Sequence, residues 1–180
     1  MGFWVSISKV LRNPQNWLAG IYASLINLPV FWLGAFKGVD YLSQVDHLKN
    51  SQAQVINGLL FIGLIVGSPL FGYLSGRLRR RKLPMVAGAV GSIVILSAIM
   101  WSGLHSESAL SALFFLLGVV ISSQVIAYPL VVEINPLSLT GTAEGVASVL
   151  IMLGGLTISV MKLLLQHSGD YVLKQTNMFY

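Results

Sequence analysis

The sequence contains no cysteine and few charged residues. Of its 180 residues only 9% are charged and six are acidic, whereas 55% are hydrophobic and the mean hydropathy is +0.78. Without cysteine, the chain has neither a disulfide framework nor a thiolate metal site. Because a soluble domain carries roughly 25% charged residues, this composition excludes an ordinary water-soluble fold and indicates a membrane protein.

The positive charge is concentrated in one short stretch. The net charge is +5, and five basic residues fall among the six residues Arg77–Lys82, between two apolar runs. The pI of about 9.7 therefore describes one loop rather than a basic surface. For this reason no nucleic-acid partner is expected.

Long apolar runs make up most of the remaining sequence. A bilayer core about 30 Å thick is crossed by roughly 20 apolar residues in a helix. Runs of this length, with Lys162 as the one charge inside them, are residues 17–36, 55–75, 85–104, 109–132 and 145–165. No linker divides these runs. We therefore predict an all-α, polytopic membrane helix bundle with five transmembrane helices, forming a single membrane domain over residues 1–180.

The two ends of the chain differ from these spans. Residues 1–13 mix apolar side chains with Lys9 and Arg12, which is typical of a helix lying in the membrane interface. Asn13 and Pro14 then predict a helix start, because asparagine caps free amides and proline suits the first helical position. The tail, residues 166–180, is too short and too polar to cross the membrane.

Orientation follows from lysine and arginine in the short loops, because these residues are retained in the cytoplasm. The loop Arg77–Lys82 is therefore expected to be cytoplasmic. Counting spans outward from it places the N-terminus in the cytoplasm, and Glu107 and the C-terminus outside. Within the spans, Gly63 and Gly67 form a pair that favours close helix packing. Kinks are expected at three prolines: Pro29, Pro69 and Pro129.

The basic loop is part of a longer pattern that begins at Gly72. Three residues follow it, then come Gly76, Arg77, one further residue, Arg79, Arg80 and Arg81. This resembles the signature between the second and third helices of each half of the major facilitator superfamily of secondary transporters. Gly72, Arg77, Arg80 and Arg81 match that signature. Gly76 stands where the family has Asp, and Arg79 where it has Gly.

Three further stretches extend this resemblance over nearly the whole chain. "KVLRNPQNWLAGIYASLINLPV" resembles the start of the seventh helix of these transporters, and "GSPLFGYLSGRLRRRK" the end of the eighth helix with its loop. "EINPLSLTGTAEGVASVLIMLGG" is similar to the junction of the tenth and eleventh helices. The resemblance implies a partial major facilitator fold, namely a truncated C-terminal half with helices seven to eleven.

The resemblance also implies a function. The chain would be part of a secondary active solute transporter that works by alternating access in a bacterial inner membrane. Its partners would be a small-molecule solute, the lipid bilayer and a complementary N-terminal six-helix half, because the chain is expected to be incomplete on its own. No cofactor is implied. The alternative is a non-transporting membrane scaffold, or the relic of a truncated transporter gene.

By the same resemblance, the basic loop takes part in a cytoplasmic gate. Glu133 ends the fourth span on the side of Arg77 and Arg80, and an acid at a membrane boundary is costly unless it is hydrated or paired. We therefore expect Glu133 beside Arg77 or Arg80. Glu144 opens the fifth span on that side, where the helix dipole also stabilises an acid. Solvated arginines that set only the topology are the alternative.

The substrate cavity of this family is lined by the first and fourth helices of each half. In this chain the corresponding candidates are Tyr22, Asn27, Gln124 and Tyr128. A polar side chain at that depth needs a partner, which is a substrate, water or another helix. For Ser122 and Ser123, bonding between helices is the expected role.

Nothing in the sequence points to catalysis or to a metal. No acid lies in the middle of a span, and the three histidines lie in loops or at the end of a span. His105, Ser106 and Glu107 are adjacent in one loop, so they do not form a nucleophile triad facing a protected site. We therefore expect neither an enzyme nor a metal site.

Overall fold

The computed structural model describes residues 3–44, 48–78, 80–101 and 106–176, and these form helices joined by short turns. Five helical stretches are long and apolar enough to cross a membrane: Pro14–Ala35, Asn50–Leu78, Lys82–Trp101, Glu107–Glu133 and Leu137–Thr157. Each overlaps one of the five predicted runs. The prediction of an all-α membrane bundle with five spans is therefore confirmed.

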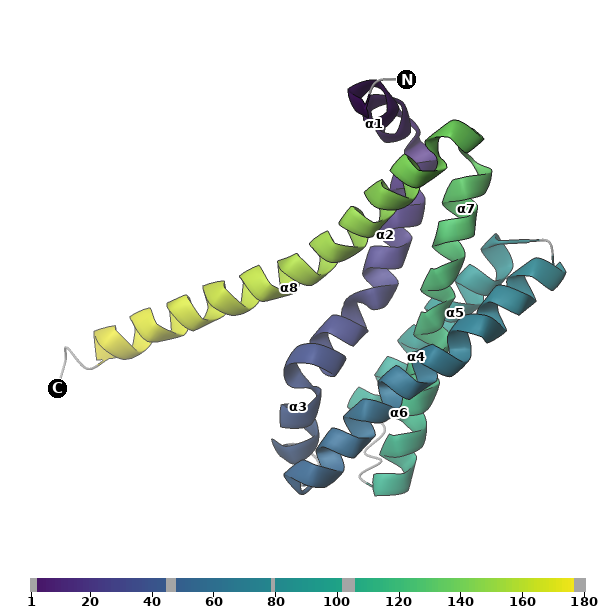
Figure 1. The fold of residues 1–180 in the computed structure, drawn as a ribbon. Helices are drawn as coiled ribbons and strands as arrows, with labels where there is room; N and C mark the ends of the chain where they lie inside the picture. Colours follow the sequence, from purple (N-terminus) through teal and green to yellow (C-terminus); the bar gives the residue numbers. More distant parts are fainter. Residues whose placement is uncertain (1–2, 45–47, 79, 102–105, 177–180) are drawn as a thin grey trace.

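The elements follow one another up and down the bundle (Figure 1), and α1 lies across one end of it. Their order along the chain is α1 (Phe3–Arg12), α2 (Pro14–Pro29), the π-helix η1 (Val30–Lys37), α3 (Gly38–Gln44), α4 (Asn50–Leu78), α5 (Lys82–Trp101), α6 (Glu107–Ile121), the 3-10 helix η2 (Ser122–Ile126), α7 (Ala127–Glu133), the 3-10 helix η3 (Leu137–Leu139) and α8 (Thr140–Thr176).

The start of α2 has the predicted cap. The Asn13 side-chain oxygen accepts a hydrogen bond from the Gln15 amide at 3.1 Å, and Pro14 occupies the first helical position. Capping satisfies one of the amides that a helix start leaves without a partner. The first membrane helix therefore begins at Pro14, three residues before the predicted apolar run.

Two of the three prolines coincide with a change of helix type. The π-helix η1 begins directly after Pro29, and the 3-10 helix η2 ends shortly before Pro129. Because proline has no N–H, Pro129 leaves the carbonyl of Val125 without its usual intrahelical donor. Pro69, in contrast, lies inside α4, which continues as an α-helix around it. The first and fourth spans thus change helix type at or near a proline, while the fifth span begins with the 3-10 helix η3.

The tightest helix pair, α4 and α6, packs through glycines. A Cβ atom on Gly63 would collide with the Phe115 carbonyl oxygen, and one on Gly118 would collide with that of Leu60. The predicted pair Gly63 and Gly67 therefore serves close helix packing. Next to this contact lies the largest apolar core cluster, which includes Leu60, Phe114, Leu117 and Ile121.

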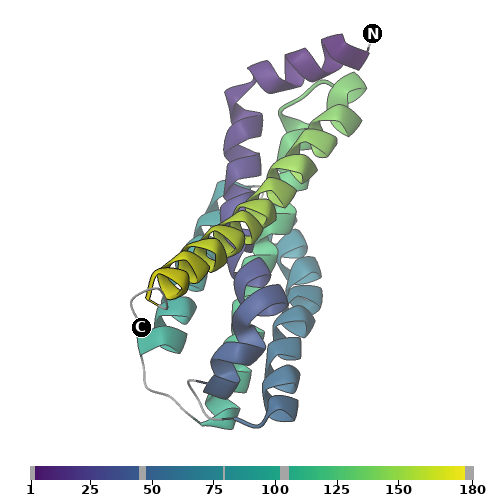
Figure 2. The same ribbon diagram turned by 90° about the vertical axis from the view of Figure 1, so that its left-hand side faces the viewer.

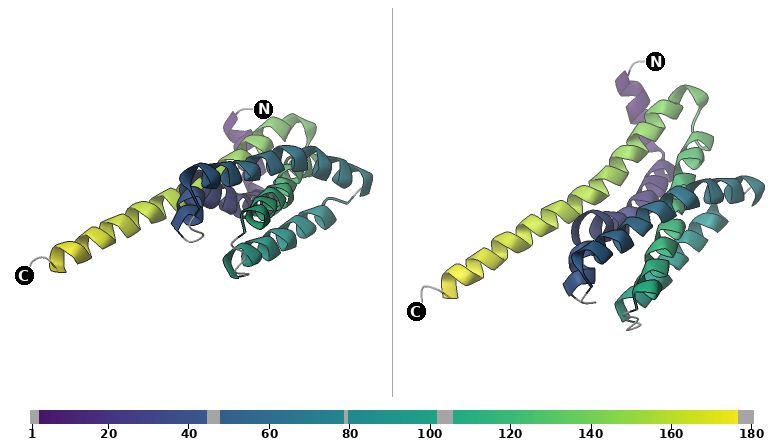
Figure 3. Two further views of the ribbon diagram at one scale, coloured as in Figure 1. Left: turned by 90° about the horizontal axis from the view of Figure 1, so that it is seen from below. Right: turned by 60° about the horizontal axis from the view of Figure 1, so that its bottom comes forward.

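Helix α8 crosses α2 and then leaves the bundle. Figure 2 shows α8 passing obliquely over α2, and the views of Figure 3 show its C-terminal end lying away from the other helices. The crossing is close because a Cβ on Gly154 would collide with Ser24, and one on Gly20 with Leu150. The helix continues through most of the predicted tail to Thr176, and residues 177–180 lie outside the described part.

Candidate functional site

The side chain of Tyr22 joins three helical segments at the centre of the site. Its hydroxyl donates to the Met85 carbonyl oxygen on α5 at 2.9 Å and lies 2.9 Å from the Ser123 hydroxyl in η2, which donates to it. Tyr22 is half-buried. This predicted cavity residue therefore has its hydrogen bonds satisfied by neighbouring helices.

The 3-10 helix η2 is buried between α4 and α5. Ser122 and Ser123 are both fully buried, and a Cβ on Gly67 or on Gly88 would collide with them. The Ser122 hydroxyl donates to the Val119 carbonyl oxygen at 2.6 Å, one turn earlier in the same helix. Ser123 thus bonds to another helix, as expected, whereas the Ser122 hydroxyl bonds within its own span.

The remaining cavity candidates lie on the first and fourth spans. Gln124 and Tyr128 are half-buried, and Tyr128 packs beside Tyr22 on the small apolar cluster of Ala23, Ala127 and Ile151. Asn27 is only 9% exposed, and its side-chain oxygen has no hydrogen-bond partner among the described residues. In a membrane span such an acceptor is costly unless something else satisfies it.

Asn57 on α4 shares this feature with Asn27. It is 8% exposed, and its side-chain oxygen has no partner in the described part of the chain. Its amide nitrogen, however, donates to the Gly34 carbonyl oxygen of the π-helix at 2.9 Å. Asn57 therefore ties α4 to η1, which is a packing role.

A groove of about 600 Å³ runs between α2, α5 and α7. Tyr22, Ala19, Met85 and Leu130 line its apolar part, and Lys82 and Gln15 line one end. Of the four predicted cavity residues, the structure places Tyr22 on this groove, while the residues that line it do not include Asn27, Gln124 or Tyr128.

At one end of the bundle, Arg81 joins the ends of two helices. Its guanidinium donates to the Glu133 carboxylate at the end of α7, with Nη2 2.5 Å and Nε 3.2 Å from Oε1. Through Nη1 it also donates to the buried Ser75 hydroxyl on α4 at 2.9 Å. The bond to Glu133 raises the pKa of Arg81, so this guanidinium stays charged. We call Ser75, Arg81 and Glu133 the arginine clamp.

The other residues of the basic pattern lie outside this clamp. Glu133 was expected beside Arg77 or Arg80, but it pairs with Arg81, because Arg81 stands in the turn between α4 and α5 and reaches back across both helix ends. Arg77 is in the last turn of α4 and lies 3.5 Å from the Tyr73 hydroxyl. Arg80 is exposed.

Gly72 and Gly76 are not closely packed against other helices, and Glu144 is only partly buried. A Cβ on Gly72 or Gly76 would meet no atom within 4 Å, so neither position requires glycine for close packing. Glu144 is half-buried in the second turn of α8, where its backbone carbonyl accepts from Ser148.

An asparagine cluster at the same end was not predicted from the sequence. The amide nitrogen of Asn16 donates to the Asn135 side-chain oxygen at 3.1 Å, and that of Asn135 donates back to Asn16 at 2.7 Å. Asn16 also donates to the Val10 carbonyl oxygen and Asn135 to that of Val131, while Asn13 donates to Ile134. No local pattern pairs residues 119 positions apart, so sequence reasoning had no signal for this cluster.

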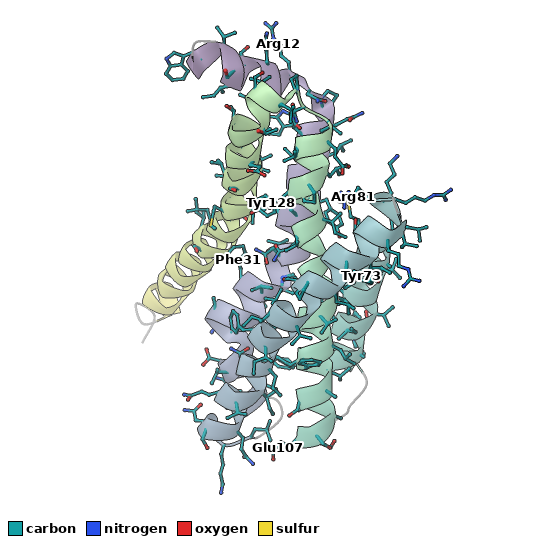
Figure 4. The ribbon with its side chains drawn as sticks, turned by 45° about the vertical axis from the view of Figure 1, so that its right-hand side comes forward. Arg12, Phe31, Tyr73, Arg81, Glu107 and Tyr128 are labelled. Carbon is teal, nitrogen blue, oxygen red and sulfur yellow. The ribbon has the colours of Figure 1, made fainter. Side chains whose placement is uncertain are left out.

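The charged and polar groups are thus divided between the two ends of the bundle. Figure 4 shows Arg12 at one end, Arg81 toward that same end and Glu107 at the opposite end. At the Glu107 end, Gln52 donates to the Glu107 carboxylate at 2.9 Å, and Lys37 pairs with Asp40 at 3.3 Å. The arginine clamp and the asparagine cluster both belong to the Arg12 end.

Comparison with known proteins gives one match. The family model of the Major Facilitator Superfamily matches residues 3–165. This range is most of the chain and includes all five membrane spans. Neither the curated proteins nor the solved structures compared with the chain give a match. With five apolar helices and a family match of this extent, the chain is an integral membrane protein that belongs to the Major Facilitator Superfamily, a family of small-solute transporters.

Proposed function

We propose that this chain moves a small solute by alternating access and that its first and fourth spans form one wall of the solute cavity. The supporting observation is Asn27, which lies near the middle of the span Pro14–Ala35 with a buried, unsatisfied side-chain oxygen. A polar group at that depth marks a functional site by default. In this proposal, a bound solute or a water molecule beside it donates a hydrogen bond to the Asn27 side-chain oxygen.

The arginine clamp is the proposed cytoplasmic gate. It ties the end of α4 to the end of α7, so these two helix ends separate only after the Arg81–Glu133 bonds break. Glu133 has 51% of its side chain exposed, and an ion pair with that much water around it contributes only about 0–1 kcal/mol. The clamp can therefore open at low cost. Gly72, Arg77, Arg80 and Glu144 are proposed to belong to the same gate, although no bond from them to Glu133 is found among the described residues.

The opposite wall is proposed to come from a complementary six-helix half, because rocking around a midplane site needs two facing units. The proposed location is a bacterial inner membrane. By the retention of lysine and arginine in the cytoplasm, the basic loop and the N-terminus are proposed to lie inside and the C-terminus outside. Arg12 and Arg81 lie toward the same end of the molecule (Figure 4), which supports this orientation.

Uptake by membrane vesicles tests the proposal. Vesicles would contain this chain with or without a six-helix first half from the family, and would be offered radiolabelled sugars, amino acids and organic anions. We expect saturable uptake of one class only when both halves are present. Asn27→Ala should lower this uptake at least tenfold with the protein level unchanged.

Asn57→Ala is the matched control, because Asn57 is equally buried and also carries an unsatisfied oxygen, but its amide holds η1. It should lower stability and leave the uptake per folded protein unchanged. Uptake by this chain alone that survives Asn27→Ala would overturn the proposed wall. No uptake of any solute with both halves present would favour a non-transporting scaffold.

A further inference from the structure

The groove between α2, α5 and α7 has a charged mouth and an apolar interior. Gln15 and Lys82 stand at its mouth, in the first turns of α2 and α5, and both are exposed. Tyr22 and Ala89 line it seven residues further along each helix. At 1.5 Å per residue, the groove therefore extends about 10 Å from its mouth into the membrane.

The groove is open sideways, toward the acyl chains of the bilayer. Its rims are Leu18 on α2 and Val86 on α5, which are 68% and 60% exposed. No described helix covers these apolar side chains, so they are open to the surrounding bilayer. A molecule of the bilayer can therefore enter the groove directly, without passing through water.

The charge at the mouth is available for an anion. Arg81, the neighbour of Lys82, is already bound to Glu133, whereas Lys82 makes no ion pair within the described residues. No carboxylate is among the residues that line the groove. The Lys82 ammonium thus stands at the membrane boundary above an apolar groove that contains no opposing charge.

We propose that this groove binds an anionic phospholipid. The phosphate lies on the Lys82 ammonium with the Gln15 amide beside it, and one acyl chain fills the apolar part along Met85 and Val86. Basic pockets between membrane helices at the cytoplasmic side have the same chemistry. The lipid would contact α2 and α5 together, next to the Tyr22 hydrogen bond that joins them. Assigning it to the cytoplasmic leaflet rests on the proposed orientation of the chain.

Fluorescence quenching by brominated lipids tests the groove directly. Because the chain has no native cysteine, one introduced cysteine can carry the only label. The complete chain would carry a single fluorescent label on Ala89→Cys inside the groove, in nanodiscs of phosphatidylcholine with a small fraction of dibromo-phosphatidylglycerol or dibromo-phosphatidylcholine. We expect dibromo-phosphatidylglycerol to quench the label at about a fivefold lower mole fraction than dibromo-phosphatidylcholine. This is the preference for an anionic lipid that one lysine near a membrane surface gives. Both leaflets have one composition, so neither orientation nor transport enters the result.

Two controls separate a built site from general charge attraction. Lys82→Gln should abolish the preference for phosphatidylglycerol, while Arg80→Gln, which removes an exposed charge two residues away, should retain it. A label on Met100→Cys, at the other end of α5 and 63% exposed, should show no preference between the two lipids.

Each alternative result overturns the proposal. An equal loss in Arg80→Gln and Lys82→Gln would mean diffuse attraction to the surface. Competition by soluble glycerol phosphate as strong as that by the lipid would mean a site for phosphate alone. Absence of quenching by either brominated lipid would mean that the groove is closed to the bilayer, as it would be beneath a further protein helix.

Discussion

Asn16 and Asn135 hydrogen-bond to each other in both directions, through side-chain amides at 3.1 and 2.7 Å. Asn16 is 2% exposed and stands in the first turn of α2, whereas Asn135 follows the end of α7. Two helix ends separated by 119 residues are thus fixed by a pair of neutral side chains. Asn16 also donates to the Val10 carbonyl oxygen of α1, so the pair links the ends of α1, α2 and α7.

Removing one member of this pair should be costly. Asn16→Ala removes the donor to the Asn135 side-chain oxygen and one of the two donors to the Val10 carbonyl oxygen, and an unsatisfied group that is shielded from water costs about 1–3 kcal/mol. We expect the free energy of unfolding in detergent to fall by that amount. Gln54→Ala, an exposed change on α4, should stay within about 0.5 kcal/mol of the native value.

The double variant Asn16→Ala, Asn135→Ala should be less destabilised than the sum of its single variants, because the second substitution removes the orphaned partner. A coupling of about 0.5–3 kcal/mol is expected for residues in one network. Strict additivity would show that the two amides do not act together.

Breaking the arginine clamp should increase the motion between the ends of α4 and α7 and should lower the free energy of unfolding only slightly. In Glu133→Gln, Arg81 keeps Ser75 but loses its charged partner. Spin labels on Leu78→Cys and Ser138→Cys, at the end of α4 and in the turn before α8, should then show a broader and longer distance distribution. The stability loss should be about 1 kcal/mol or less, because the pair is half exposed.

Glu144→Gln is the control for this measurement, because it removes an acid at the same end that makes no ion pair within the described chain. Its distance distribution should match that of the native sequence. If Glu133→Gln gave that same native distribution, the clamp would not hold the two helix ends together.

The contact between α4 and α6 should tolerate no added methyl group. Gly63→Ala places a Cβ against the Phe115 carbonyl oxygen, and overpacking of this kind costs about 1–3 kcal/mol. Gly58→Ala on the same helix meets no atom within 4 Å and should be neutral or stabilising by up to about 1 kcal/mol. Thermal unfolding of the two variants side by side measures the difference; equal melting temperatures would argue against this close approach.

Labelling from one side of the membrane tests the orientation. We expect Ser108→Cys to react with an impermeant maleimide added outside the cell, and Ser138→Cys to react only after the membrane is opened. Both serines are exposed; Ser108 lies at the start of the fourth span, and Ser138 lies at the start of the fifth span, beyond the end of the fourth. The reverse pattern would place the basic loop outside, against the retention of lysine and arginine in the cytoplasm.

The sequence by itself determined those features that depend on neighbouring residues. Apolar runs of sufficient length made the five spans, because a backbone in lipid must satisfy its own hydrogen bonds as a helix. Asn13 with Pro14 fixed the start of α2, since a cap needs only residues that follow within one turn. The prolines marked candidate breaks, but Pro69 lies inside α4 without a change of helix type, so the sequence did not determine which prolines coincide with a break.

Only the tertiary structure decided which side chains meet. Hydropathy does not define how a buried helix is rotated about its axis, because such a helix is apolar nearly all round. That rotation selects Arg81 rather than Arg77 or Arg80 as the partner of Glu133. It also brings Tyr22 to Ser123 and Asn16 to Asn135, while the Asn27 oxygen is left without a partner among the described residues. Helix packing, set by glycine contacts over long sequence separations, fixes these relationships.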